Sequence, residues 1–520
     1  MSTAPATGVA LRTLGAGLAL GSTLRMLPAL LLACASPSGA SPSKPNILLV
    51  SMDTVRFDRT SLGGGRPTTP NLAALAEAGS SWTRAYAVGN ESIYSHAALM
   101  TGRYPSEVAL PDYGSYAIPT DVPTLATVLG AYGYHTAAFT GGGHVIADFG
   151  FGQGFNVFRT ATGDTQLGSL FDSVPSALAW IGEQGDAPWF AFVHGYDVHS
   201  PYVQRGPFRH LWGSVADAGR MDAIAADPVA VEQLRGHEWF PDRAPQDFLH
   251  AAGPRILGLS VYTLPAAPRP DERVITLTDG EVEHLRDHYD SGLSYADVWL
   301  GQLLAGVDLD HTLVVVISDH GEDLLDHGFV NHRAGLWDSS LHVPLVVAGP
   351  GFMGGGEKSG MVDLRSVVPT VLRAVGALAP AGVVAPALQD NPSASVVYAE
   401  GVMDAVTVRD ASHRLILSDA RLAAGAPDLG TRALDTPEGS LNAGLYAEPN
   451  AENRLGRDGL TDPGSLTEAD ALRAALLGIR AQLRPASVTG APVSPALRDA
   501  LRARGYWTPG EPLDGAASDR

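Results

Sequence analysis

Two segments far apart in the sequence carry side chains that could hold a metal ion. Asp53 directly follows one apolar run, and Asp319 and His320 directly follow another. Carboxylate oxygens combined with a neutral imidazole suit Mn, Zn or Fe better than Ca, which prefers oxygen ligands alone. The segment SDHGE at 318–322 also provides a glycine at the point where the chain must turn. These residues predict one divalent metal, with Mn or Zn favoured and Ca as the alternative, and they leave room for a second metal.

Ser92 is the candidate nucleophile. It stands just before a small-residue helix expected from about Ser95 to Gly102, and a glycine can end a helix. Backbone N–H groups and the dipole at a helix N-terminus favour an anion and a nucleophilic oxygen. The alternative for Ser92 or Ser95 is a plain N-cap.

The elements that must position these side chains are short apolar runs. Residues 46–52 and 312–318 have the length of strands, and a third run at 189–194 leads into the polar segment 195–202. Such runs suit buried parallel strands, whose carboxyl ends gather ligand sites in open α/β sheets. Helical patterns lie between them at 71–79, 123–133 and 281–304. Strand and helix therefore alternate, as a mostly parallel sheet requires.

The pattern changes twice along the rest of the chain. Residues 205–273 break the alternation and predict an insertion, either a lid near the site or a plain surface excursion. A strand over 341–351 and a helix over 363–376 complete the main sheet. Beyond about residue 380 we expect short strands at 396–400, 405–409 and 414–418 and a helix at 466–483. We therefore expect a catalytic domain over 45–380 and a smaller α+β subdomain within 381–520.

The N-terminal segment resembles the signal of a bacterial lipoprotein. Residues 31–34 read LLAC after an apolar stretch, and a Ser/Pro-rich tether follows at 35–44. Cys34 is the only cysteine, which excludes an intramolecular disulfide and any multi-cysteine metal site. The alternative is an ordinary signal peptide or a short membrane anchor. We expect an exported lipoprotein of the cell envelope, in the outer membrane or periplasm, attached to the membrane through lipidated Cys34.

The charge balance limits the partners. The formal net charge is −20, and no run of Lys or Arg could follow a phosphate backbone, which argues against nucleic acid. Lys44 and Lys358 are the only lysines. An anionic substrate must therefore be met by Arg, His or a metal.

In their order and spacing, these segments resemble the sulfatase family of the alkaline phosphatase superfamily. The segments that carry the resemblance are 45–56, 69–72, 92–103, 133–137 with His144, 197–202, 318–322, 342–345 and 369–370, with a looser likeness at 445–446 and 452–453. The resemblance implies an alkaline-phosphatase-like α/β fold, in which helices flank a mostly parallel sheet. The pattern beyond residue 380 adds the smaller C-terminal α+β subdomain.

The chain departs from the family pattern at the nucleophile and at the metal. Sulfatases of the usual kind oxidise their Cys or Ser to formylglycine, and the modifying enzymes read a Pro and an Arg that are here Tyr94 and His96. The second Asp of the usual opening pair is Thr54, and His320 stands where an amide is common. An all-oxygen calcium site is therefore lost, which favours Mn or Zn.

Histidines are expected to replace the lysines of the family. The lysine that normally stands two residues before His144 is Gly142. A His-rich tract follows the second metal motif, where the family places a charged residue near the substrate. We expect His332 in this role, with His327 second.

The resemblance implies a specific role for each of these residues. The metal ligands would be Asp53, Asp319, His320 and the oxygen of Ser92. Ser92, or its formylglycine form, would attack sulfur or phosphorus in line. His199 is the candidate general acid, because an imidazole can donate and recover a proton near neutral pH. His96 and His144 would hold the remaining substrate oxygens.

Three functions follow in order of preference. The first is hydrolysis of a small-molecule or glycan sulfate monoester at the cell surface. The second is cleavage or transfer of a phosphodiester or phosphonate by unmodified Ser92, as in other members of the superfamily. The third is a noncatalytic surface binding protein.

Overall fold

The described part of the chain lies within one compact unit that spans Lys44–Arg520. The computed structural model describes residues 44–108, 117–161, 167–199, 202, 206–208, 211–213, 279–324, 326, 330–332, 336–401, 405–418, 444–447, 463–484 and 494–496. The predicted signal with Cys34, nearly all of the tether, most of the predicted insertion at 205–273, His327 and residues 452–453 lie outside these ranges. Among the helices within them, none combines the length and the apolar character needed to cross a bilayer.

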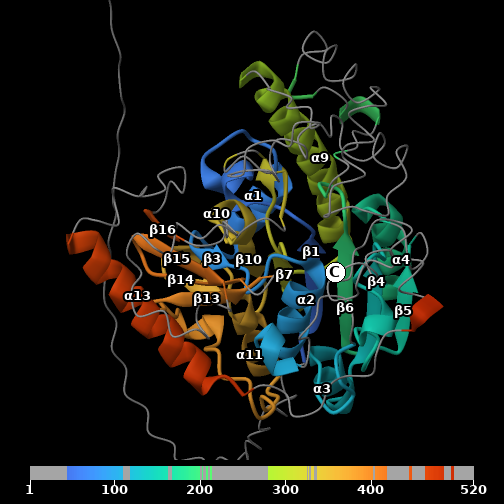
Figure 1. Ribbon diagram of the computed structural model, residues 1–520. Helices are drawn as coiled ribbons and strands as arrows, with labels where there is room; N and C mark the ends of the chain where they lie inside the picture. The colour runs from blue at the N-terminus through green and yellow to red at the C-terminus, as the bar shows by residue number, and fades with distance from the viewer. Residues whose placement is uncertain are drawn as a thin grey trace, which may run out of the picture. The chain divides into compact units, whose positions relative to one another are not determined.

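An eight-stranded sheet forms the centre of this unit (Figure 1), in the order β11-β2-β10-β7-β1-β6-β4-β5. The strands are β1 Asn46–Met52, β2 Ser80–Trp82, β4 His135–Thr140, β5 Val157–Thr160, β6 Trp189–Gly195, β7 Thr312–Ile317, β10 Leu345–Ala348 and β11 Gly356–Lys358. The five strands from β7 to β5 are parallel, whereas β10 runs antiparallel to β7 and β2. The prediction of a mostly parallel sheet is confirmed, and the strand expected over 341–351 is shorter and reversed in direction.

The three predicted strands occupy the middle of the sheet. β1 lies between β6 and β7, and Ser51 is paired with His194 on one side and Ile317 on the other. Nearly every residue of these strands is buried, as their unbroken apolar runs require. The parallel register brings the carboxyl ends of all three strands to one edge, so the polar residues that follow them emerge together.

Helices cover both faces of the sheet (Figure 1). They are α1 Pro70–Ala78, α2 Ser92–Thr101, α3 Leu125–Ala131, α4 Leu170–Gly182, α9 Asp279–Ala305 and α11 Val367–Ala374, and the short α10 Asp338–Leu341 precedes β10 in the sequence. Side chains alternate along β1, so Ile47 and Leu49 pack with α2, α3 and α11, while Leu48 and Val50 pack with α1, α4 and α9. Asp297 of α9 accepts hydrogen bonds from the backbone N–H groups of Asn71 and Leu72, which fixes the start of α1 on α9.

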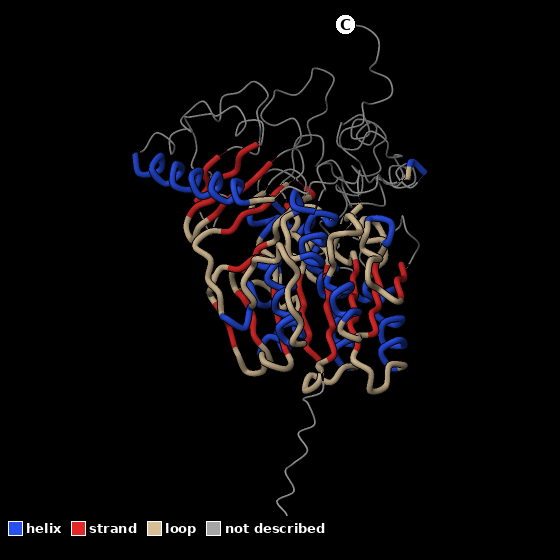
Figure 2. Tube along the Cα trace, turned by 90° about the horizontal axis from the view of Figure 1, so that it is seen from below, coloured by secondary structure: helices blue, strands red, loops and turns tan. Residues whose placement is uncertain are grey.

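A second sheet forms the predicted C-terminal subdomain. Its antiparallel strands are β13 Val397–Glu400, β14 Ala405–Arg409, β15 His413–Ser418 and β16 Gly444–Ala447, and α13 Pro463–Gln482 packs on β14 and β15 (Figure 2). Two further pairs are β3 Ala85–Tyr86 with β12 Val362–Asp363, and β8 Asp323–Leu324 with β9 Val330–Asn331. The expected α+β character is confirmed, while the domain boundary at 380 stays a prediction.

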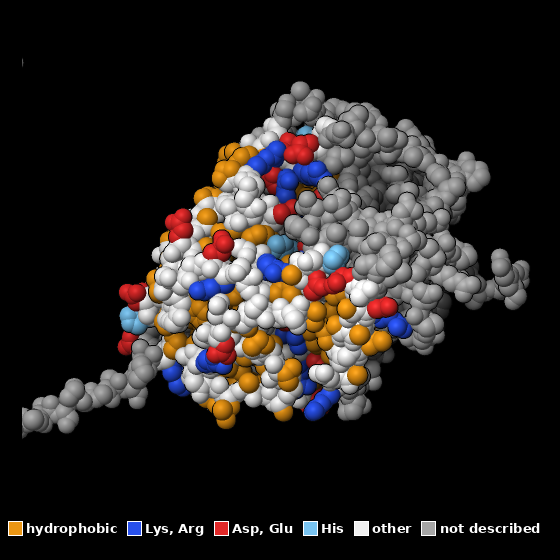
Figure 3. Space-filling model, turned by 90° about the vertical axis from the view of Figure 1, so that its left-hand side faces the viewer, with side chains coloured by type: hydrophobic (Ala, Val, Ile, Leu, Met, Phe, Trp, Pro, Cys, Tyr) orange, Lys and Arg blue, Asp and Glu red, His pale blue; other side chains and the backbone are white. Residues whose placement is uncertain are grey.

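Helix α2 belongs to two hydrophobic cores. Ile93 and Ala97 pack in the core of the main sheet, whereas Ala98 packs with residues of the smaller sheet and α13, such as Val408 and Leu472. On the molecular face drawn in Figure 3, apolar side chains are scattered among acidic and basic ones that lie close to each other.

Candidate metal centre and nucleophile

The ends of β1 and β7 are bonded directly to each other. The backbone N–H of Thr54 donates to Asp319 Oδ1 at 3.2 Å, and the N–H of Val55 donates to Ser318 Oγ at 2.7 Å. Ser318 Oγ in turn donates to the carbonyl oxygen of His320 at 2.7 Å. These bonds fix the two predicted metal motifs in one arrangement.

The predicted ligands Asp53, Asp319 and His320 come together. Their ligand atoms all lie within 4.8 Å of one another, and the three side chains are fully buried. Asp53 Oδ1 and Asp319 Oδ2 accept no hydrogen bond from any described residue, although buried polar atoms are nearly always bonded. His320 Nδ1 lies 3.0 Å from the carbonyl of Gly321, so Nδ1 carries the proton and Nε2 has a lone pair to offer. Two unbonded oxygens and one imidazole nitrogen fit a divalent cation.

The electrostatics of this cluster also fit a bound cation. Burial, and then repulsion from Asp319, raises the pKa of Asp53 well above its ordinary value. Burial would also raise the pKa of Asp319, but the neighbouring His320, His96 and His194 outweigh it and lower that pKa. Burial lowers the pKa of His320 to about 4, so its imidazole is neutral near pH 7. A cation among these ligands would relieve the repulsion between the two carboxylates.

Ser92 contacts two of the three predicted ligands. Its Oγ donates to Asp53 Oδ2 at 3.1 Å and lies 3.4 Å from His320 Nε2. The helix begins at Ser92 rather than at about Ser95, because the N–H of Ser95 already bonds to the carbonyl of Glu91. The predicted end is confirmed, since Gly102 closes α2 at a φ of 69°. Ser92 is thus the first residue of the helix, with its oxygen directed at the cluster.

His96 lies one turn further along α2 and is fully buried. Its Nδ1 lies 2.8 Å from the carbonyl of Ser92, so it donates there, and its Nε2 accepts from Ser51 Oγ at 3.0 Å. Nδ1 is also 3.3 Å from Asp319 Oδ2. Both ring nitrogens therefore have protein partners, and a role for His96 in holding substrate oxygens stays a prediction.

His194 is a site residue that the sequence prediction missed. It is fully buried near the end of β6, where its Nδ1 accepts the N–H of Gly141 at 3.3 Å. The proton then resides on Nε2, which lies 3.3 Å from Asp53 Oδ2. The third apolar run was recognised, and pairing it in parallel with β1 would have placed His194 beside Ser51.

His199 and His332 form a row of rings that leads to the metal cluster. The ring of His199, which is half-buried, lies 5.2 Å from that of His332, and His332 lies 4.3 Å from His320. Burial would lower the pKa of His332, but Glu322 and Glu91 outweigh it and raise the pKa to about 9. Its ring nitrogens lie 3.4 Å from Glu322 Oε1 and 3.8 Å from Glu91 Oε1. The raised pKa favours the protonated form of His332 beside the metal cluster, and its predicted role near the substrate stays a prediction.

His144 is buried in the loop that follows β4. Its backbone N–H bonds to the hydroxyl of Tyr196 at 3.2 Å, and that hydroxyl donates to the carbonyl of Gly142 at 3.1 Å. The Tyr196 ring contacts His199, with 5.4 Å between ring centroids. Tyr196 therefore connects His144 to His199, and substrate binding by His144 stays a prediction.

Comparison with known proteins decides the family. The family model described as Sulfatase matches residues 45–377, which is more than half of the chain. The chain belongs to the sulfatase family. The predicted resemblance and the predicted class of enzyme, a sulfuric ester hydrolase, are confirmed at this level.

Two relatives illustrate how this sulfatase compares in sequence. The N-acetylglucosamine-6-O-sulfatase of Bacteroides thetaiotaomicron is 25% identical over 419 residues, which cover 70% of this chain and 74% of the relative. Arylsulfatase K of Bos taurus is 22% identical over 366 residues, which cover 65% of this chain and 64% of the relative.

Solved structures confirm the fold of this sulfatase. The phosphonate monoester hydrolase of Silicibacter pomeroyi superposes with a TM-score of 0.61 at 18% identity, covering 85% of this chain and 96% of the other. A protein solved in complex with its substrate D-glucosamine-2-N,6-O-disulfate gives a TM-score of 0.58 at 17% identity, covering 85% and 98%. These likenesses establish the alkaline-phosphatase-like architecture that the sequence predicted.

Proposed function

We propose that this sulfatase is a metal-dependent hydrolase that cleaves sulfate monoesters through Ser92 or its formylglycine form. The observation that carries the proposal is the position of Ser92 Oγ, which is bonded to Asp53 Oδ2 at 3.1 Å and lies 3.4 Å from His320 Nε2. Among the described residues, Ser92 is the one whose hydroxyl is hydrogen-bonded to a side chain of the proposed metal ligands.

The proposed metal ligands are Asp53, Asp319, His320 and Ser92 Oγ. The metal, when bound, would lower the pKa of the nucleophile and neutralise charge on the substrate's oxygens. Asp53 Oδ2 accepts a hydrogen bond from the Ser92 hydroxyl, which leaves the lone pairs of Oγ free for metal binding and attack. One imidazole ligand favours Mn or Zn over Ca.

His199 is the proposed general acid for the leaving alcohol. Its ring is only half-buried, whereas those of His96, His194, His320 and His332 are buried. It can therefore reach a substrate that extends out of the cluster. The neighbouring His332, held cationic by Glu91 and Glu322, would favour the negatively charged ester.

A sulfated glycan is the proposed substrate class. The relative with 25% identity is named as an N-acetylglucosamine-6-O-sulfatase, and a structural neighbour was solved with a disulfated glucosamine. Release of an inorganic anion from a sugar hydroxyl requires protonation of the leaving oxygen, which is the role proposed for His199.

The alternative is phosphoester or phosphonate cleavage by unmodified Ser92. The residues that formylglycine-forming enzymes read are absent, since Tyr94 and His96 replace the usual Pro and Arg. Both are buried, and His96 is bonded to Ser51 and Ser92. A noncatalytic binding role ranks third, because Asp53, Asp319 and His320 lie together beside Ser92 in a cluster that fits a cation.

Mass spectrometry of the Ser92 peptide from the native host distinguishes the two chemistries. Formylglycine at Ser92 appears as the loss of two hydrogens and supports the sulfatase proposal. The same preparation is then assayed with matched aryl sulfate, aryl phosphodiester and aryl phosphonate esters, with Ser92→Ala as the blank. Unmodified Ser92 with a preference for the phosphorus esters would establish the alternative and overturn sulfate hydrolysis.

We also propose that the protein is exported and attached to the cell envelope through lipidated Cys34. The lipoprotein-like sequence around the single cysteine supports this proposal. Metabolic labelling with a palmitate analogue should mark the wild type and not Cys34→Ser. Equal release of both proteins into the soluble fraction would contradict membrane attachment.

A further inference from the structure

Thr54, the residue after Asp53, has an unusual backbone conformation. Its φ is 60°, and only one other non-glycine residue of the described ranges, Asn391, has a positive φ. A β-branched residue is disfavoured in this left-handed region, and such a conformation persists only where the surroundings enforce it. Thr54 is fully buried, so the enforcing contacts must come from the protein.

Tyr289 of α9 supplies these contacts. Its hydroxyl donates to the carbonyl oxygen of Thr54 at 2.6 Å and accepts the backbone N–H of Arg56 at 2.9 Å. One side-chain oxygen thus joins the two peptide groups on either side of Val55, and the first of these groups also follows Thr54. Tyr289 is fully buried and itself has no described contact with Asp53, Asp319 or His320.

The opposite side of the same turn is bonded to the metal cluster. The N–H of Thr54 donates to Asp319 Oδ1, and the N–H of Val55 donates to Ser318 Oγ. Because Oδ1 is engaged in this way, Asp319 Oδ2 is the oxygen left beside His320 Nε2, at 3.3 Å. The orientation of a proposed metal ligand therefore depends on the conformation of Thr54.

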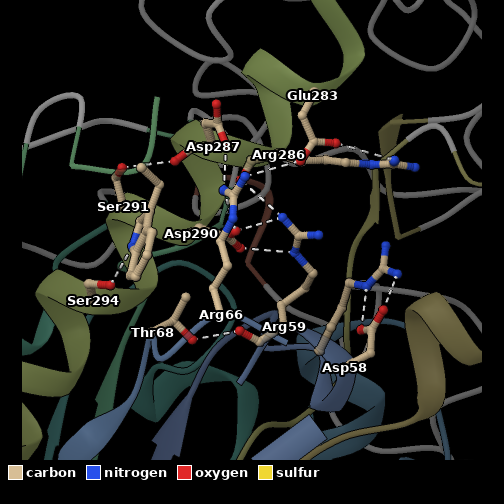
Figure 4. Close-up of polar contacts among 12 residues, drawn as sticks. Asp58, Arg59, Arg66, Thr68, Glu283, Arg286, Asp287, Asp290, Ser291 and Ser294 are labelled. Carbon is tan, nitrogen blue, oxygen red and sulfur yellow. Dashed lines mark hydrogen bonds and ion pairs between the residues drawn. The ribbon is translucent and has the colours of Figure 1, made fainter. Parts of the chain in front are cut away.

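Ion pairs hold α9 against the segment that follows the turn (Figure 4). Arg59 bonds to Asp290 at 2.9 and 2.6 Å, and Arg66 pairs with Asp287 and with Asp290. Asp287 and Asp290 lie on either side of Tyr289 in the sequence of α9. The segment 56–66 is thereby fixed to the helix turn that carries the tyrosine.

We propose that Tyr289 is a positioning residue for the metal centre. Its hydroxyl holds the left-handed turn at Thr54, and that turn orients Asp319 for metal binding. This inference rests on the proposed metal centre, and it adds a residue 235 positions from Thr54 in the sequence whose described hydrogen bonds go to the backbone of Thr54 and Arg56.

The experiment measures binding of Mn²⁺ and Zn²⁺ to the full chain by titration calorimetry. Tyr289→Phe removes only the hydroxyl, and we expect its metal affinity to fall about ten-fold or more, as for other groups that orient ligands. Tyr134→Phe is the matched control, because Tyr134 donates the same kind of bond to Pro45 at the opposite end of β1, at 2.7 Å. The control should keep the wild-type affinity even if its melting temperature falls.

A second pair of variants separates positioning from general destabilisation. Glycine adopts positive φ without strain, so in the Thr54→Gly protein the turn depends less on the two hydrogen bonds of the Tyr289 hydroxyl. Tyr289→Phe should therefore cost at least three-fold less affinity in the Thr54→Gly background than in the wild type. If Tyr289→Phe alone folds poorly, the double variant is compared with Thr54→Gly, and the two affinities should differ less than about three-fold.

The outcomes are distinct. A wild-type chain that binds neither metal overturns the proposed metal centre and the inference with it. A wild type that binds metal, combined with Tyr289→Phe at wild-type affinity, overturns the inference alone. Equal losses for Tyr289→Phe in both backgrounds also overturn it, because they assign the loss to stability rather than to the turn.

Discussion

Ser92 Oγ and Asp53 Oδ2 lie 3.1 Å apart although the two residues are 39 positions apart in the sequence. One residue is the first of helix α2 and the other is the first after strand β1. The bond joins the candidate nucleophile to a candidate metal ligand through a single proton. Both the reaction and its metal requirement should therefore respond to changes at this pair.

Removal of the Ser92 hydroxyl should abolish turnover without unfolding the protein. We expect Ser92→Ala to lower kcat by about 10³-fold or more, since no other described hydroxyl replaces the nucleophile. Ser95→Ala is the matched control on the same helix, where it removes a bond to the carbonyl of Gly89. It should cost about 1 kcal/mol of stability and little activity. Comparable losses of kcat in both variants would contradict the assignment of Ser92.

Asp319→Asn should separate metal binding from folding. Neutralising Asp319 removes its repulsion with Asp53 but also its attraction to the neighbouring histidines, so the two effects oppose each other and the stability of the metal-free protein should change little. The stabilisation by added metal, about 2.7 kcal/mol for a ligand at 100 times its Kd, should be lost. Thermal unfolding with EDTA and with excess Mn²⁺ measures both quantities. Glu357→Gln on the exposed strand β11 is the control, and an Asp319→Asn protein that is still stabilised by Mn²⁺ would refute the ligand assignment.

His199→Gln should show the selectivity of a lost general acid. Esters of poor leaving groups need protonation of the leaving oxygen, so we expect kcat to fall about 10²-fold or more for alkyl or glycan esters. Activated aryl esters, whose leaving groups need no proton, should lose less than about ten-fold. The ratio of the two rates is the measurement. Equal losses for both substrate types would point to a binding role for His199 instead.

His342 should make the stability depend on pH below about 6.5. Its ring stacks on Phe57 and Tyr86, with centroids 4.5 and 5.1 Å away, and its Nε2 donates to the carbonyl of Thr83 at 2.8 Å. Burial lowers the pKa of His342 below its ordinary 6.5, so as pH falls through 6.5 the unfolded chain takes up a proton that the folded chain does not. The contribution of His342 is therefore complete above about pH 7.5 and declines below it, by at most about 1.4 kcal/mol per pH unit.

The check is denaturant unfolding of the wild type and His342→Gln between pH 5 and 8. Glutamine retains a donor for the Thr83 carbonyl but does not titrate. The difference in unfolding free energy between the two proteins should be constant at the alkaline end and should shift in favour of His342→Gln at the acidic end. A difference that stays constant over the whole range would show that His342 does not titrate on unfolding.

Asp338 should be important for stability because it forms ion pairs with two buried arginines. Arg409 lies 3.1 Å from its carboxylate, and Arg414 forms a second, short ion pair with it. Asp338→Asn should cost about 3 kcal/mol or more, since it removes the charge that compensates two buried guanidinium groups. The exposed pair Arg373 and Asp390 is the comparison, where Asp390→Asn should change the melting temperature much less, because water screens exposed ion pairs. Similar melting temperatures for the two variants would contradict this difference.

The sequence predicted the strands whose apolar character is continuous. β1, β6 and β7 are rich in Val, Leu, Ile and Phe and were placed within one or two residues. β4 reads HTAAFT, and its Ala and Thr residues give no clear strand pattern. Helix α4 contains Pro175 in its interior, where a proline removes a backbone hydrogen bond and usually indicates a helix break.

The candidate site was predictable as far as it follows directly from strand ends. Asp53, Asp319 and His320 come straight after apolar runs, so parallel strands were enough to bring them together. His194 depends on the register between β1 and β6, and Tyr289 depends on a contact 235 residues away. Such contacts are set by how the elements pack, which a local pattern of residue types does not encode.

The membership of α2 in two cores gives the C-terminal subdomain a part in the architecture of the active site. Ala98 lies within the helix that begins with Ser92, and Val88 and Tyr104 lie on either side of it in the sequence. A chain cut at residue 380 would remove the C-terminal residues that bury all three. The smaller sheet therefore cannot be treated as a removable module. Insertions or substitutions in that sheet would therefore change the packing that holds helix α2 and, with it, the position of Ser92.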